Sequence, residues 1–158
     1  MCANDSGSTL APSDGVNSSF ASRVLIVEDE QSIRDVLVEL FDVDGTRVSA
    51  AATLDAAKTE LASEIFDLIV TDIRLGGRRD GGLQVMAAAG VLSPEAVVIG
   101  LTAYPDDDNR CASQRLGATH FLEKPVSLET LALLASRAGV ATAMMPAGEG
   151  VTSTGGPR

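Results

Sequence analysis

Five side chains suited to phosphate chemistry stand along the chain, each at or just beyond the end of a short apolar run. They are three carboxylates, a hydroxyl and an ammonium: Glu28, Asp29, Asp72, Thr102 and Lys124. Carboxylates that share a site repel one another and raise one another's pKa unless a cation lies among them. Mg²⁺ suits this set, because it binds oxygen ligands and is held by one or two carboxylates together with phosphate oxygens.

A carboxylate can also act as a nucleophile and accept a phosphoryl group. Such a transfer depends mainly on positioning and on neutralising the charge of the equatorial phosphoryl oxygens. In this set Lys124 would neutralise one oxygen, Thr102 would donate a hydrogen bond to another, and Mg²⁺ would take the third. The residue types therefore predict a phosphoryl-transfer site at which an aspartyl phosphate forms.

The apolar runs that carry these side chains alternate with segments of helical periodicity. In one such segment, apolar residues recur from Ile33 to Phe41 at i, i+3, i+4, i+7 and i+8, which indicates an amphipathic helix. Further helices are expected after Thr53, near Leu83–Ala89, from about Asp106 to Gly117, and around Leu128–Ala135. The predicted strands are Arg23–Val27, Thr46–Ala50, Phe66–Thr71, Ala96–Leu101 and Thr119–Leu122.

Near-continuous apolar strands that alternate with helices are typical of an α/β fold, a doubly wound five-stranded parallel sheet with helices on both faces. Ligands of such folds bind beyond the carboxyl ends of the strands. The five chemical residues are expected to converge at that edge of the sheet.

Composition narrows the class of protein. The chain has 158 residues, 45% of them apolar, and a formal net charge of −10, which argues against direct binding to nucleic acid or to an anionic membrane. Its two cysteines, Cys2 and Cys111, match neither a disulfide framework nor a metal-ligand spacing, and no signal peptide or membrane span is evident, so a cytoplasmic protein is expected. We predict a domain at 23–138 between a disordered tail at 1–22 and a flexible tail at 139–158.

Four stretches of the sequence resemble the receiver domains of two-component response regulators, over about residues 23–138: VLIVEDE, IVTDIRL, GLTAY and GATHFLEKP. The resemblance implies a flavodoxin-like sheet of strand order 2-1-3-4-5. It also implies that Asp72 is the phosphoacceptor, and that Mg²⁺ is held by Glu28, Asp29, Asp72 and the backbone carbonyl of Arg74.

The same resemblance implies a switch. Thr102 would shift toward the phosphoryl group and Phe121 would rotate inward, and the peptide bond between Lys124 and Pro125 would be cis. In this family the positions of Arg74 and Tyr104 flank the path of the attacking water. Because both side chains are bulky here, we expect an acyl phosphate that hydrolyses slowly.

One stretch departs from the family. Its members usually have a proline and a tight turn soon after the phosphoacceptor, whereas this chain has a longer Gly- and Arg-rich loop at 75–82. The loop is expected to be mobile and basic beside an acidic site. This departure bears on the partner surface and not on the phosphorylation chemistry.

The resemblance implies a signalling switch that takes a phosphoryl group from a histidine kinase or a histidine phosphotransfer protein and acts on a downstream protein target. A dimer formed on phosphorylation is one possible output. A phosphorelay intermediate, or a receiver from a larger regulator or hybrid kinase, would fit the same residues. A phosphorylation-independent interaction module fits less well, because every site residue type is retained. A phosphohydrolase of the haloacid-dehalogenase type needs an Asp where this chain has Arg74, so a turnover enzyme is not expected.

Overall fold

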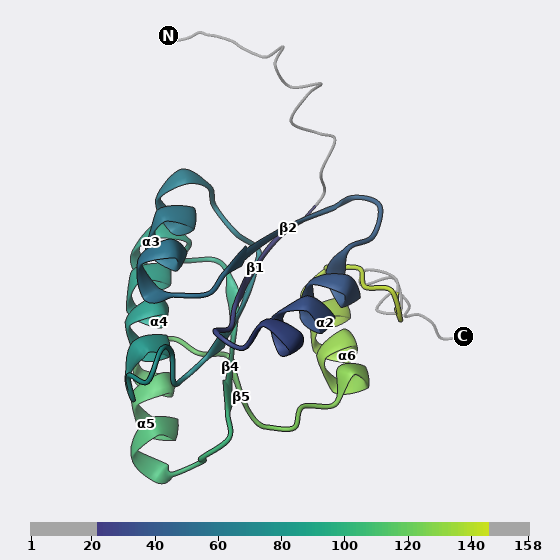
Figure 1. Cartoon of the computed structure of the whole chain (residues 1–158). Helices are drawn as coiled ribbons and strands as arrows, with labels where there is room; N and C mark the ends of the chain where they lie inside the picture. Colours follow the sequence, from purple (N-terminus) through teal and green to yellow (C-terminus); the bar gives the residue numbers. More distant parts are fainter. Residues whose placement is uncertain (1–21, 146–158) are drawn as a thin grey trace, which may run out of the picture.

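The computed structural model describes residues 22–145, which form one parallel sheet with helices on both faces (Figure 1). The strand order is β2-β1-β3-β4-β5, which confirms the predicted doubly wound, flavodoxin-like topology. The strands are β1 (Ser22–Val27), β2 (Thr46–Ala51), β3 (Leu68–Asp72), β4 (Val97–Thr102) and β5 (His120–Glu123). The helices are α2 (Gln31–Phe41), α3 (Leu54–Ser63), α4 (Gly81–Leu92), α5 (Asp107–Arg115) and α6 (Leu128–Arg137).

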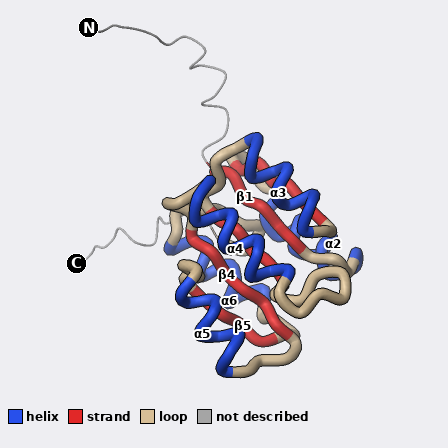
Figure 2. The backbone as a smooth tube through the Cα atoms, turned by 90° about the vertical axis from the view of Figure 1, so that its left-hand side faces the viewer, coloured by secondary structure: helices blue, strands red, loops and turns tan. Residues whose placement is uncertain are grey.

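Two apolar layers flank the sheet, because successive side chains of a strand point to opposite faces. On β1, Leu25 and Val27 pack with α3 and α4, whereas Val24 and Ile26 pack with α2 and α6. Figure 2 looks onto the face covered by α3, α4 and α5. A strand covered by helices on both sides has apolar residues at successive positions, and such unbroken apolar runs made the strands predictable from the sequence.

Side-chain hydrogen bonds cap two of the helices close to where the sequence predicted them to begin. Thr53 Oγ1 accepts a hydrogen bond from the Ala56 N–H at 3.1 Å, and Asp106 Oδ1 accepts one from the Asn109 N–H at 2.7 Å. Such caps satisfy amide groups that have no partner inside the helix. Gly117, with φ +95°, follows the end of α5 as expected.

The bounds of β3 and β4 differ from the predicted ones. Phe66 was predicted to begin the third strand, but it lies before β3, buried, and its N–H donates to Ser93 Oγ at 2.9 Å. At the other end, Asp72 and Thr102 are the last residues of β3 and β4 instead of following them.

The packed domain extends beyond the predicted boundary at residue 138. Val140 is buried between α2 and α6, and the Ala143 N–H donates to the Leu40 carbonyl at 2.7 Å. The predicted tail at 139–158 is therefore wrong for residues 139–145, because the small residues around Val140 hide its role in closing the core. At the other end, Ser22 is buried and belongs to β1. The remaining parts of both predicted tails lie outside the described residues.

Within residues 22–145, none of the helices combines the length and the apolar character that crossing a membrane requires.

Candidate functional site

The predicted site residues meet at the carboxyl edge of the sheet. Glu28 follows β1, Asp72 ends β3, Thr102 ends β4 and Lys124 follows β5. Parallel strands in register bring these ends together, since Val27 pairs with Thr71, and Asp72 with Leu101. The edge thus gathers residues that are up to 96 positions apart in sequence.

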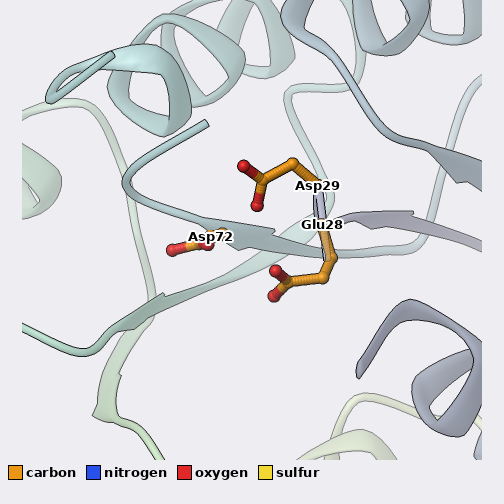
Figure 3. Close-up of side chains that lie close together, drawn as sticks. All are labelled: Glu28, Asp29 and Asp72. Carbon is orange, nitrogen blue, oxygen red and sulfur yellow. The ribbon is translucent and has the colours of Figure 1, made fainter. Parts of the chain in front are cut away.

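Three carboxylates form the centre of the site (Figure 3). Glu28, Asp29 and Asp72 each offer an oxygen, and these oxygens all lie within 4.8 Å of one another. Glu28 and Asp72 are buried, with only 1% and 6% of their surfaces exposed, whereas Asp29 is exposed. Clustered carboxylate oxygens are the donors that hard divalent cations prefer, so the donor set fits a metal ion such as Mg²⁺ or Ca²⁺.

Lys124 is the cation within this cluster. Its Nζ lies 2.9 Å from Glu28 Oε1 and 3.1 Å from Asp72 Oδ2. The peptide bond between Lys124 and Pro125 is cis, as the sequence resemblance implied, and the Lys124 N–H donates to the Thr102 carbonyl at 2.7 Å. One ammonium thus faces two buried carboxylates, which leaves a net negative charge in the cluster.

The pKa of both buried carboxyl groups is raised above its ordinary value. Burial is the largest cause in each case, and it outweighs the hydrogen bonds and charge of Lys124, which lower the pKa. For Lys124, burial alone would lower the pKa. The hydrogen bonds and charges of Glu28 and Asp72 outweigh burial and raise it. The ammonium is therefore held in its charged form beside the phosphoacceptor candidate.

Arg74 contributes a backbone donor and a side chain to the site. Its N–H donates to Asp72 Oδ1 at 3.2 Å, and its guanidinium lies over the Tyr104 ring, 4.7 Å from the centroid. The two residues named from the sequence as lifetime determinants thus touch each other. That the Arg74 carbonyl binds a metal stays a prediction.

Thr102 and Phe121 both lie where a switch could use them. Thr102 is fully buried, and its Oγ1 accepts a hydrogen bond from the Tyr104 N–H at 3.0 Å. Phe121 is half-buried against the layer under α3 and α4, and the guanidinium of Arg110 lies 4.8 Å from its ring centroid. Their predicted movements remain predictions.

Three further residues contact the site without having been indicated by the sequence. Arg34 donates from Nη1 to the Glu28 carbonyl at 2.9 Å, and the Gly76 N–H donates to Asp29 Oδ2 at 2.9 Å. Gly82 approaches Asp72 so closely that a Cβ would lie 2.0 Å from the Asp72 carbonyl oxygen. The paired glycines Gly81 and Gly82 after the third strand were the available sequence signal for that last contact.

Comparison with known proteins agrees with this geometry. Residues 24–135 match the response regulator receiver domain. The alginate biosynthesis transcriptional regulatory protein AlgB of Pseudomonas aeruginosa is 33% identical over 115 residues, which are 73% of this chain and 25% of AlgB. The KDP operon transcriptional regulatory protein KdpE of Escherichia coli K12 is 35% identical over 111 residues, which are 70% of this chain and 48% of KdpE. The chain thus spans about a quarter to a half of the length of these curated relatives.

Solved structures give the same match. A response regulator protein from Burkholderia pseudomallei, determined with a phosphorylated aspartic acid, a calcium ion and citrate, has a TM-score of 0.66 and 29% identity, covering 74% of this chain and 68% of that one. The beryllofluoride-activated NtrC4 receiver domain dimer has a TM-score of 0.65 and 33% identity, covering 73% of this chain and 94% of that one. The sheet order, the acidic cluster with its lysine, and these matches together show that the chain belongs to the response regulator receiver domain family.

Proposed function

We propose that this chain is a phosphorylation-dependent signalling switch that accepts a phosphoryl group on Asp72 from a histidine kinase or a histidine phosphotransfer protein. The observation that carries the proposal is the ammonium of Lys124, held 3.1 Å from Asp72 Oδ2 beside a cluster of three carboxylates. This arrangement combines a nucleophilic carboxylate with a fixed cation at the position where phosphoryl charge would lie.

In the proposed transfer, an Asp72 oxygen bonds to phosphorus while the bond from phosphorus to the donor's histidine nitrogen breaks. The bonding electron pair stays on the imidazole, which takes up a proton from solvent. Lys124 neutralises one phosphoryl oxygen, and the Thr102 hydroxyl, released from the Tyr104 N–H, donates to another. Stabilisation of this kind is the main contribution that a protein makes to phosphoryl transfer.

The metal in this proposal is Mg²⁺, held by Glu28, Asp29, Asp72 and the Arg74 carbonyl. When bound, it would supply positive charge to the phosphoryl oxygens and offset the repulsion among the carboxylates. The donor chemistry of the cluster supports a hard divalent cation, and the Burkholderia pseudomallei relative was determined with calcium.

A groove next to Lys124 supports docking of the phosphoryl donor. It has a volume of about 350 Å³ and lies between α2 and the segment after β5. Its lining is apolar apart from Ser32 and Lys124, and it includes Val36, which is 44% exposed. A helix of the donor seated there with its apolar face inward would bring a histidine close to Asp72.

The stacked Arg74 and Tyr104 support a slow loss of the phosphoryl group. Water must approach phosphorus opposite the Asp72 oxygen for hydrolysis, and two bulky side chains held against each other beside the site would hinder that approach. The acyl phosphate is therefore proposed to be long-lived.

The proposed output is a contact with a downstream protein, governed by Thr102 and Phe121, and a phosphorylation-dependent dimer is a second form that it could take. A phosphorelay intermediate and a receiver of a larger regulator or hybrid kinase use the same site. Retention of the phosphoryl group in the presence of a phosphotransfer protein separates a terminal switch from a relay.

No turnover activity, direct nucleic-acid contact or membrane contact is proposed. The free, exposed thiol of Cys111 is compatible with a cytoplasmic location.

The test is intact-mass analysis after incubation with a small acyl phosphate, with and without Mg²⁺. Wild type should gain a single phosphoryl group only with Mg²⁺, and Asp72→Asn should gain none. Wild-type protein that is folded yet takes up no phosphoryl group would contradict the proposal and favour a phosphorylation-independent interaction module.

A further inference from the structure

The loop between β3 and α4 begins with a tight turn closed by two backbone hydrogen bonds. The Leu75 N–H donates to the Arg78 carbonyl at 3.1 Å, and the Arg78 N–H donates to the Leu75 carbonyl at 2.8 Å. Between them, Gly76 and Gly77 have φ angles of +58° and +81°. Positive φ at both central residues is the pattern that glycine favours in two-residue turns. A Cβ at either position would have nothing within 4 Å, so backbone conformation and not lack of space calls for glycine there.

This turn contacts the metal cluster through one amide group. The Gly76 N–H donates to Asp29 Oδ2 at 2.9 Å, across 47 positions of sequence. Asp29 is exposed and is repelled by the neighbouring carboxylates of Glu28 and Asp72. Within residues 22–145, Gly76 is the donor that holds the Asp29 side chain in the cluster.

A carboxylate has two oxygens, so Asp29 can accept from Gly76 on Oδ2 and offer Oδ1 to a cation. We propose that Gly76 is a positioning residue for metal binding: its N–H orients the Asp29 carboxylate, and through this bond the order of the loop at 75–80 depends on the bound metal. The proposal rests on the proposed function, in which Asp29 is a metal ligand. Hydrogen bonds that orient a metal ligand typically change metal affinity by about 10- to 100-fold.

Coupling between two sites is reciprocal, so a loop that favours metal binding must itself become more ordered when metal binds. The loop carries an adjacent, exposed pair of basic residues, Arg78 and Arg79. Trypsin cleaves after such residues when the backbone around them can open. Cleavage at Arg78 and Arg79 is thus a direct readout of loop order that requires no phosphorylation.

The experiment measures Mg²⁺ affinity by calorimetry for wild type, Gly76→Pro and Gly77→Ala, using the full chain. Gly76→Pro removes the N–H and also strains the turn, whereas Gly77→Ala strains the same turn and retains the Gly76 amide. Gly76→Pro should bind Mg²⁺ about tenfold more weakly. Gly77→Ala should stay within about threefold of wild type, because strain present both with and without the metal does not change the affinity. Because proline cannot adopt the φ of +58° found at Gly76, Gly76→Pro should also lower the midpoint of thermal unfolding in EDTA. Mg²⁺ affinities are therefore compared well below both midpoints, which separates positioning from stability.

Trypsin digestion of the same proteins tests the coupling. Mg²⁺ should slow cleavage after Arg78 and Arg79 several-fold in wild type and have little effect in Gly76→Pro. In EDTA, Asp29→Ala should speed cleavage, because it removes the acceptor for Gly76. Glu28→Gln, which alters the cluster without contacting the loop, should leave cleavage in EDTA unchanged.

Two results would overturn the proposal while leaving the proposed function intact. In the first, Gly76→Pro binds Mg²⁺ as tightly as wild type does. In the second, wild type binds Mg²⁺ but its loop is cleaved at the same rate with and without the metal. Wild type that binds no Mg²⁺ at all overturns both the metal assignment of the proposed function and this inference.

Discussion

The Nζ of Lys124 lies 3.1 Å from Oδ2 of Asp72, although the two residues are 52 positions apart and lie at the ends of different strands. The ammonium lies beside the carboxylate that we propose as the phosphoacceptor. Lys124 is therefore the side chain whose removal gives the most direct test of the proposed chemistry.

Lys124→Met keeps much of the length of the side chain and removes its charge. We expect it to slow Mg²⁺-dependent phosphorylation of Asp72 by a small acyl phosphate roughly 100-fold, the usual effect of removing one stabilising donor. Lys58→Met, on the exposed side of α3, is the matched control and should behave as wild type. Phosphorylation rates are followed by intact mass. Equal rates for the two variants would show that Lys124 takes no part in the transfer.

The raised pKa values of Glu28 and Asp72 predict a pH dependence for metal binding. Because the metal requires the ionised carboxylates, protons compete with it at a pH above the ordinary values of 4.5 and 3.8. Mg²⁺ affinity should fall as the pH drops through the raised values, and binding near them should release protons. Calorimetry in buffers of different ionisation enthalpy measures this release. An affinity that declines only below the ordinary carboxyl values would contradict the assignment.

The same shifts have a definite sign for stability. In metal-free protein the folded state binds these protons more tightly than the unfolded chain does. The stability contributed by the two carboxyl groups is therefore fully present below their ordinary pKa values and is lost as the pH rises through the raised folded values. Mg²⁺ should accordingly stabilise the domain more at neutral pH than in acid.

The contact between Arg74 and Tyr104 predicts the lifetime of the phosphorylated protein. Tyr104→Ala should lose its phosphoryl group about two- to fivefold faster than wild type, given about 0.5–1 kcal/mol for an exposed cation–π contact. Tyr104→Phe keeps the ring and should decay like wild type. If the stack is the obstacle, Arg74→Ala and the double variant should decay no faster than Tyr104→Ala. Decay is measured by intact mass after removal of the donor. A Tyr104→Ala lifetime equal to that of wild type would show that the contact between Arg74 and Tyr104 does not hinder hydrolysis.

Gly82 tests how the backbone of α4 holds Asp72 in place. A Cβ at Gly82 would lie 2.0 Å from the Asp72 carbonyl oxygen and 2.6 Å from the Ile73 Cα, both backbone atoms. Gly82→Ala should therefore destabilise the domain by about 3 kcal/mol or more, at the upper end of overpacking effects. Gly90, in the same helix, is exposed, and the nearest atom to its Cβ would be 3.9 Å away. Gly90→Ala should stabilise the domain by about 0.5–1 kcal/mol. Denaturant unfolding distinguishes the two variants.

The parts of this molecule that the sequence predicted are those set by local pattern. Apolar runs such as Val24–Val27 identify strands buried on both faces, and their ends locate Glu28, Asp72, Thr102 and Lys124 at one edge. Parallel pairing then brings these residues together whatever the details of the loops.

The missed features depend on contacts between segments far apart in the chain. The bond from Gly76 to Asp29 requires the folded loop, and the place of Val140 in the core requires α2 and α6 to be packed already. Neither residue has neighbours in sequence that would distinguish it from a flexible Gly-rich segment. The stacking of Arg110 on Phe121 is of the same kind, since α5 and β5 meet only in the folded sheet.

The groove beside Lys124 gives a prediction that separates docking from chemistry. Val36→Asp places a charge in its apolar wall, so transfer from a histidine kinase or phosphotransfer protein that phosphorylates wild type should slow by at least tenfold, because a buried, unpaired charge is costly at an interface. Phosphorylation by a small acyl phosphate should be unchanged, since the small donor has no need of the groove. Val91→Asp, on α4 and 78% exposed, lies outside the groove and should be normal with both donors. If Val36→Asp slowed phosphorylation equally with both donors, the substitution would disturb Asp72 itself. If it slowed phosphorylation with neither donor, the protein donor would dock on another surface.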